Sequence, residues 1–94
     1  MYEKYLDYIP FGRENAIPGH ELKTLLGVDD RTMREIVAKL RETYCIVNHQ
    51  DGEGYYRPSE DDYAAVLGYI AQEKSRAKSI NRSLKGAKKW ISGQ

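Results

Sequence analysis

A helical repeat of apolar residues opens the chain. Its members are spaced i, i+3, i+4 and i+7, the pattern that marks one face of a helix: Tyr2, Tyr5, Leu6 and Ile9. Pro10 lacks a backbone N–H, so the pattern predicts a short first helix that ends there.

The next apolar repeat predicts a second helix, which begins near Pro18 and ends at Gly27. Its residues expected to face the core are Leu22, Leu25 and Leu26. Glycine adopts the positive φ that commonly follows a helix, so a tight turn is expected at Gly27.

A third helix is predicted to follow at once, with Asp29 as its N-cap. Apolar residues repeat at three- and four-residue spacing through it: Met33, Ile36, Val37 and Leu40. Burial of that face leaves a polar face outside, made of Arg31, Thr32, Arg34, Glu35 and Lys39.

Three short segments have strand character. Residues 15–17 form a first candidate, the β-branched run 45–47 a second, and Tyr55-Tyr56 a third. The glycine-containing segment 49–54 lies between the last two and predicts a hairpin turn. Cys45 is expected to pack in the core from its apolar strand.

One long helix is predicted from about Glu60 to Ile91, because only Gly68 and Gly86 interrupt it. At 1.5 Å per residue it would be about 45–50 Å long, which exceeds the width of so small a domain. Apolar residues occupy the a and d positions of one heptad frame, broken only by Glu73: Tyr63, Val66, Ile70, Ala77, Ile80, Leu84, Ala87 and Ile91. This seam predicts a homodimer through the C-terminal helix.

Charge divides the 94 residues unequally, although the whole chain has a net charge of +1. Residues 1–70 hold eight Lys/Arg against 13 Asp/Glu, a net of −5, and residues 71–94 hold seven against one, a net of +6. An acidic body with a basic C-terminal arm is typical of proteins that meet nucleic acid.

The order of these elements predicts the fold. Helix, short strand, helix, tight turn, helix and hairpin is the order of a winged helix-turn-helix. We therefore expect a mainly α protein with a small β-hairpin (α+β), divided into a winged helix-turn-helix domain at 1–58 and a long amphipathic helix at 59–94. The segment 22–40, LKTLLGVDDRTMREIVAKL, carries the helix-turn-helix pattern.

Several short segments also resemble a known family. They are IPFGRENAI at 9–17, LGVDDR at 26–31, LRE at 40–42, GYY at 54–56 and the basic stretch from Arg76 to Lys89. In these the chain resembles small winged helix-turn-helix DNA-binding proteins of phages and mobile elements of Gram-positive bacteria. The resemblance implies DNA binding and control of phage genes or replication. Two features differ from the family pattern, since Thr43-Tyr44-Cys45 replaces a glycine turn and the wing is acidic at Asp51 and Glu53.

The candidate DNA-contacting residues fall in three places. The predicted third helix provides Arg31, Thr32, Arg34, Glu35 and Lys39, of which Arg31 and Arg34 lie in its first turns, where base edges are usually read. Arg13 is a candidate phosphate contact ahead of the second helix. On the last helix, Lys78, Arg82 and Lys85 share one face and are expected to hold phosphates.

Other chemistry is not expected. His20 and His49 are far apart and have no metal-ligand spacing, and Cys45 is a single cysteine, which fits a reducing cytoplasm. No phosphate-binding loop or nucleophile motif is present, so no enzyme, cofactor or small-molecule substrate is expected. No run of 18 apolar residues occurs, so a membrane partner is not expected either.

The sequence therefore predicts a cytoplasmic, homodimeric protein that binds double-stranded DNA sequence-specifically, as a phage or mobile-element regulator of transcription or replication. An alternative of another class stays open. The winged helix would then be a protein-interaction module, such as an adaptor in a replication complex, and the acidic body and wing favour it.

Overall fold

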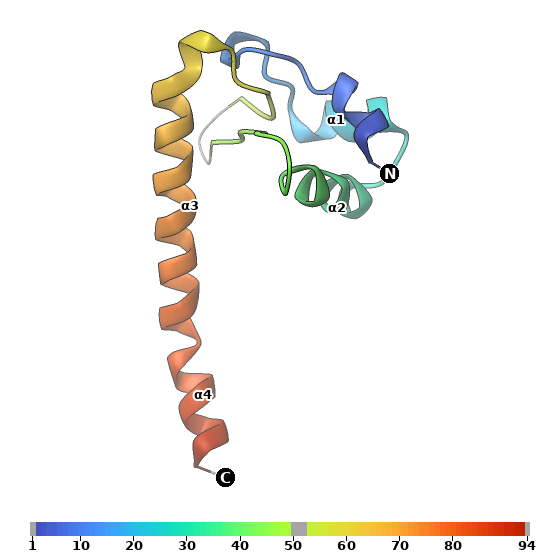
Figure 1. Ribbon diagram of the computed structural model, residues 1–94. Coiled ribbons are helices and arrows are strands. Elements are labelled where there is room, and N and C mark those ends of the chain that lie inside the picture. Colours follow the sequence, from blue (N-terminus) through green and yellow to red (C-terminus); the bar gives the residue numbers. More distant parts are fainter. Residues whose placement is uncertain (1, 50–52, 94) are drawn as a thin grey trace.

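The computed structural model describes residues 2–49 and 53–93, and the fold is mainly helical. Residues 2–49 and 53–62 form a compact body, and a long helical rod, made of residues 63–92, runs away from it (Figure 1). The longest dimension, 49 Å against 31 and 23 Å, follows this rod. The helical elements, with η for 3-10 helices, are η1 (Glu3–Tyr8), η2 (Arg13–Asn15), α1 (Gly19–Leu26), α2 (Asp30–Leu40), η3 (Glu60–Asp62), α3 (Tyr63–Ser83) and α4 (Lys85–Ser92).

The turn between α1 and α2 confirms the local sequence signals. Gly27 adopts the left-handed conformation with φ 70°, and the N–H of Val28 donates to the carbonyl of Lys23 at 3.1 Å. The Asp29 carboxylate accepts from the backbone N–H of Thr32 at 2.7 Å and so caps α2. Hydrogen bonding from Thr32 also lowers the pKa of Asp29, so the cap stays charged.

The core lies between α1, α2 and the residues that flank them. It contains Ile9, Leu22, Met33, Ile36, Val37, Leu40 and Ile46, so the predicted inner face of α2 is confirmed. Leu25, expected inside, is 53% exposed, because the core contacts only the side of α1 that carries Leu22 and Leu26. The first helix is present but is the 3-10 helix η1, whose aromatic face is half-buried against the core.

Within residues 2–49 and 53–93, strand structure is limited to single-residue pairings. Ile17 and Tyr55 exchange two backbone hydrogen bonds of 2.9 and 2.8 Å, and Val47 and Tyr56 exchange two of 2.8 and 3.0 Å. The predicted strand 15–17 is reduced to Ile17, because Asn15 belongs to η2. In the predicted strand 45–47, only Val47 pairs. The turn between Val47 and Tyr55 includes residues 50–52, which lie outside the described residues, so a β-hairpin is not confirmed.

Gly54 allows the backbone to come close to its neighbour. Its φ is 129°, and a Cβ at this position would collide with the carbonyl of Ile17. A residue without a side chain is therefore required where the Tyr55 strand segment meets Ile17.

The last helix departs from the prediction in two ways. It is not continuous, since η3 precedes α3 and Leu84 separates α3 from α4, while Gly86 lies inside α4. Its upper part also packs on the body, where Val66, Tyr69 and Glu73 are half-buried. From Lys74 to Gly93 every residue is exposed.

The sequence predicted that Cys45 packs in the core, but this prediction is wrong, because Cys45 is exposed. It precedes the single pairing residue Val47 and borders a groove between the body and α3, beside Tyr69 and Ile70. Partial burial there raises the pKa of its thiol.

Candidate nucleic-acid interface

The outward surface of α2 presents most of the candidate residues of the third helix. The side chains of Arg31, Arg34 and Lys39 are 89%, 72% and 63% exposed. Glu35 is also exposed, and Thr32 is half-buried. The surface is rigidly supported, because the opposite side of α2 supplies four core residues, which are Met33, Ile36, Val37 and Leu40.

Each basic residue of this surface has an acidic neighbour. Arg31 pairs with Glu35 at 3.4 Å. Arg34 pairs with Asp30 at 3.0 Å, and Lys39 pairs with Glu42 at 3.6 Å. Exposed pairs of this kind contribute only about 0–1 kcal/mol, so an incoming anion can replace the carboxylate at little cost.

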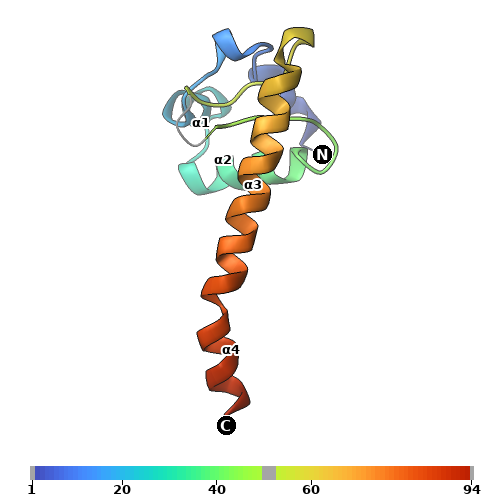
Figure 2. The ribbon, with the colours of Figure 1, turned by 90° about the vertical axis from the view of Figure 1, so that its left-hand side faces the viewer.

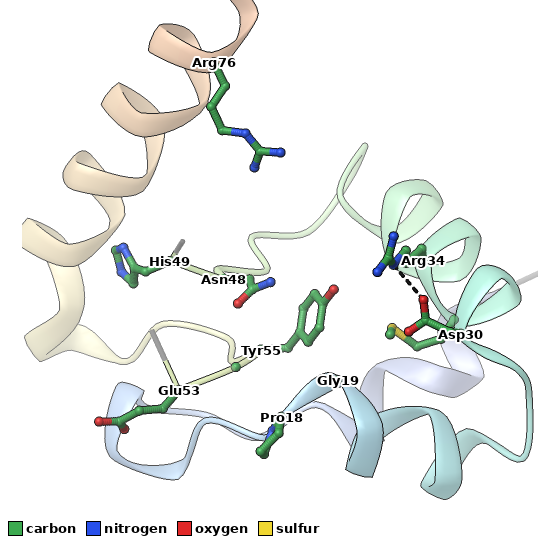
Figure 3. A pocket seen from close by; sticks show the side chains of 11 residues that line it. Pro18, Gly19, Asp30, Arg34, Asn48, His49, Glu53, Tyr55 and Arg76 are labelled. Carbon is green, nitrogen blue, oxygen red and sulfur yellow. Dashed lines mark ion pairs between the residues drawn. The ribbon is translucent and has the colours of Figure 1, made fainter. Parts of the chain in front are cut away.

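Arg34 faces a cleft between α2 and α3. The cleft has a volume of ≈ 330 Å³, and Arg34, Asn48, Tyr55 and Arg76 are among the residues that line it. Figure 3 shows Arg34 reaching from α2 and Arg76 from α3 toward the same space, with Asn48 and Tyr55 between them. Arg76 is therefore a candidate that the sequence pattern did not reveal, because only the fold places α2 and α3 on the two sides of one cleft.

Arg41 connects the end of α2 with Ile46 and with Tyr69 of α3, in the hollow that adjoins this cleft. Its Nε donates to the carbonyl of Ile46 at 3.0 Å, and its guanidinium lies over the rings of Tyr55 and Tyr69, at 5.8 and 5.4 Å. These contacts hold the end of α2 against α3, so Arg41 positions the cleft walls.

Three basic residues of the rod are exposed, as the sequence predicted, but they lie on the face opposite the one that packs on the body. They are Lys78, Arg82 and Lys85. At about 100° per residue, Lys78 lies about 180° from Tyr69, which contacts the body through Arg41 and His49. In Figure 2, α3 crosses in front of the body, so the face of α3 toward the viewer is turned away from it. The structure does not bring these residues together with the α2 surface.

Arg13 is also distant from the α2 surface. Its backbone N–H donates to the Asp62 carboxylate, which places Arg13 beside the start of α3. That end of α3 lies at the far side of the body from α2 (Figure 1). Arg13 is exposed there, and nothing in the arrangement links it to Arg31 or Arg34.

The histidines have different surroundings. His20 is exposed, whereas His49 Nε2 is 3.1 Å from the hydroxyl of the buried Tyr56 and its ring meets Tyr69 edge-on. Over the ranges 2–49 and 53–93, no three His, Cys, Asp or Glu side chains gather in a way that could hold a metal ion. In the same ranges, no helix combines the length and apolar character needed to cross a membrane.

Comparisons of the chain with protein-family models, with curated proteins and with solved structures found no match.

Proposed function

We propose that the chain is a winged helix-turn-helix protein that binds double-stranded DNA with the outward surface of α2 in the major groove. The observation that carries this proposal is the pairing of α1 and α2. A left-handed Gly27 and the Asp29 cap join them through a tight turn, and α2 is buried on one face and exposes Arg31, Arg34 and Lys39, each with an acidic partner, on the other. In this arrangement Arg31 and Arg34 contact base edges or phosphates.

The helical rod supplies a second basic surface. Its residues from 74 onward are exposed and contain all seven Lys/Arg of residues 71–94, whereas the one carboxylate of that range, Glu73, precedes them. We assign phosphate contacts on this second surface to Lys78, Arg82 and Lys85. The phosphates they contact belong to DNA other than the stretch that is seated on α2 of the same protomer. The resemblance to regulators of phages and mobile elements suggests control of transcription or replication as the purpose.

We further propose that two copies associate through the exposed end of the rod. Ile80 lies within about 20° of Tyr69 on the helix, so the apolar stripe below the body continues the face that packs on it. The stripe consists of Ala77, Ile80, Leu84, Ala87 and Ile91, and its large members are exposed. This stripe is about two heptads long instead of four, because Val66 and Glu73, which occupy seam positions farther up the helix, are half-buried against the body.

The proposed function is tested by fluorescence anisotropy with mixed-sequence duplex DNA at low salt. The double variant Arg31→Ala/Arg34→Ala should bind more weakly by several kcal/mol at most, since a bidentate base contact is worth about 1–3 kcal/mol. Lys4→Ala/Lys23→Ala removes the same charge from η1 and α1 and is the matched control.

Equal binding by the double variant and the parent would show that α2 is not the recognition helix. The acidic partners of Arg31, Arg34 and Lys39 favour a second candidate, in which this surface binds a protein. A parent chain that does not bind duplex DNA at all would support that protein-interaction module.

A further inference from the structure

Two arginines from distant parts of the chain line one cleft. Arg34 extends from the second turn of α2, and Arg76 extends from the middle of α3 (Figure 3). Both border the ≈ 330 Å³ cleft and also the adjoining hollow above Val37 and Arg41. Arg76 lies only about 20° from Tyr69 around α3, so it projects on the side that faces the body.

The surroundings of the two guanidinium groups suit an exchangeable anion. Arg34 is held by Asp30 at 3.0 Å and Arg76 by Glu73 at 3.2 Å, and all four side chains are at least 38% exposed. Asp30 and Glu53 are the carboxylates that line the cleft itself. Solvent screens such pairs, so they contribute little that a bound anion would have to replace.

Polar groups complete the cleft wall. Asn48 and Tyr55 lie between the two arginines, and Arg41, fixed by Ile46 and two tyrosine rings, borders the adjoining hollow. Arginine presents a planar fork of donors that matches phosphate oxygens, and the charge-assisted bonds it makes are the stronger kind. Because both arginines line the same cleft and the same adjoining hollow, a phosphate group bound there has two such forks in the wall around it.

We propose that this cleft is a clamp for a DNA backbone phosphate, held between Arg34 of α2 and Arg76 of α3. The inference rests on the proposed function and deepens it. A phosphate held there lies beside the recognition helix and fixes how far α2 enters the groove, because phosphate contacts set register. Arg76, and not the outward Lys78, is then the contact of α3 with the duplex seated on α2.

A double-mutant cycle tests the clamp. Anisotropy titrations compare the parent with Arg34→Gln, Arg76→Gln and both together, on a mixed-sequence duplex. Each single change should weaken binding about tenfold, the size of one charge-assisted hydrogen bond. The double variant should lose less DNA affinity than the product of the two single fold-losses, because both arginines hold the same phosphate.

Lys74→Gln is the matched control, since Lys74 is in the same helix but lies about 160° from Arg76. Combined with Arg34→Gln, it should give the simple product of the single losses. Multiplicative losses for Arg34 and Arg76 as well would overturn the clamp. A parent chain that fails to bind duplex DNA would instead overturn the proposed function, and thermal unfolding of each variant shows that the fold is retained.

The source of the phosphate is decided in a separate arm. The Nε–Hε signal of Arg76 is followed by NMR while inorganic phosphate is added at constant ionic strength. The clamp predicts that inorganic phosphate does not saturate the change in this signal below the millimolar range. It also predicts that added duplex DNA shifts the Arg76 signal, and that Arg34→Gln makes this shift smaller. Saturation by inorganic phosphate at micromolar concentration would assign the cleft to a free phosphate ligand and overturn the proposal.

Discussion

The backbone N–H of Arg13 donates to Oδ2 of Asp62 at 3.2 Å, across 49 residues of sequence. The same oxygen accepts from the backbone N–H of Ser59 at 3.0 Å and from its hydroxyl at 3.1 Å. Asp62 is buried and stands directly before α3. This carboxylate therefore fixes the point at which the rod leaves the body.

Asp62→Asn should destabilise the fold at neutral pH. The hydrogen bond from the Ser59 backbone is the largest cause that lowers the pKa of Asp62, so the charged form is the one that the fold favours. A lowered pKa gives stability that is present above the unfolded value and is lost as pH falls through the folded value. The difference in melting temperature between parent and variant should be full at pH 7 and should shrink below about pH 4.

Circular dichroism melts at pH 7, 5 and 3 measure this difference. Asp61→Asn is the control, because Asp61 is exposed beside Asp62. Equal melting temperatures of the parent and Asp62→Asn at pH 7 would contradict the role given to this carboxylate.

Two glycine substitutions should have opposite effects. Gly54→Ala places a Cβ against the Ile17 carbonyl at a positive φ and should cost at least about 2 kcal/mol of unfolding free energy. Gly68→Ala meets no atom within 4 Å in the interior of α3 and should add up to about 1 kcal/mol. Urea unfolding of both variants measures this, and a Gly54→Ala chain as stable as the parent would show that Ile17 and Tyr55 do not pair as described.

The proposed dimer predicts a selective response to changes in the rod. Ile80→Asn/Leu84→Asn should give a monomer in sedimentation experiments, since these residues are 57% and 42% exposed and serve only the seam. Lys78→Asn/Arg82→Asn alters the opposite face and should leave the dimer intact. The parent should sediment as a dimer at tens of micromolar, and a monomer at that concentration would refute the seam.

Local signals were the ones that the sequence revealed well. The Gly27 turn, the Asp29 cap and the buried face of α2 depend on neighbours within a few residues, so their spacing was sufficient to predict them. Cys45 and Leu25 were misplaced because their burial depends on which distant element covers them.

The candidate site also combines features that depend on sequence neighbours with features that depend on distant elements. The exposure of Arg31 and Arg34 follows from the helical repeat of α2, whereas the cleft with Arg76 depends on how α3 docks. Heptad spacing likewise predicted the apolar stripe of the rod. It could not show that Val66, Tyr69 and Glu73 would be half-buried against the body. Arg41, Tyr55 and Tyr69 are far apart in the sequence, and only the fold places the Arg41 guanidinium over both rings.

The salt dependence of duplex binding tests the central claim most directly. Affinity of the parent should fall linearly on a log–log plot, with a slope that grows by about 0.9 for each neutralised phosphate. Lys78→Gln/Arg82→Gln/Lys85→Gln should flatten the slope by up to about 2.7 per protomer, and equally for specific and random duplexes. A parent chain that shows no affinity for duplex DNA at the lowest salt, or an affinity that salt does not change, would contradict DNA binding.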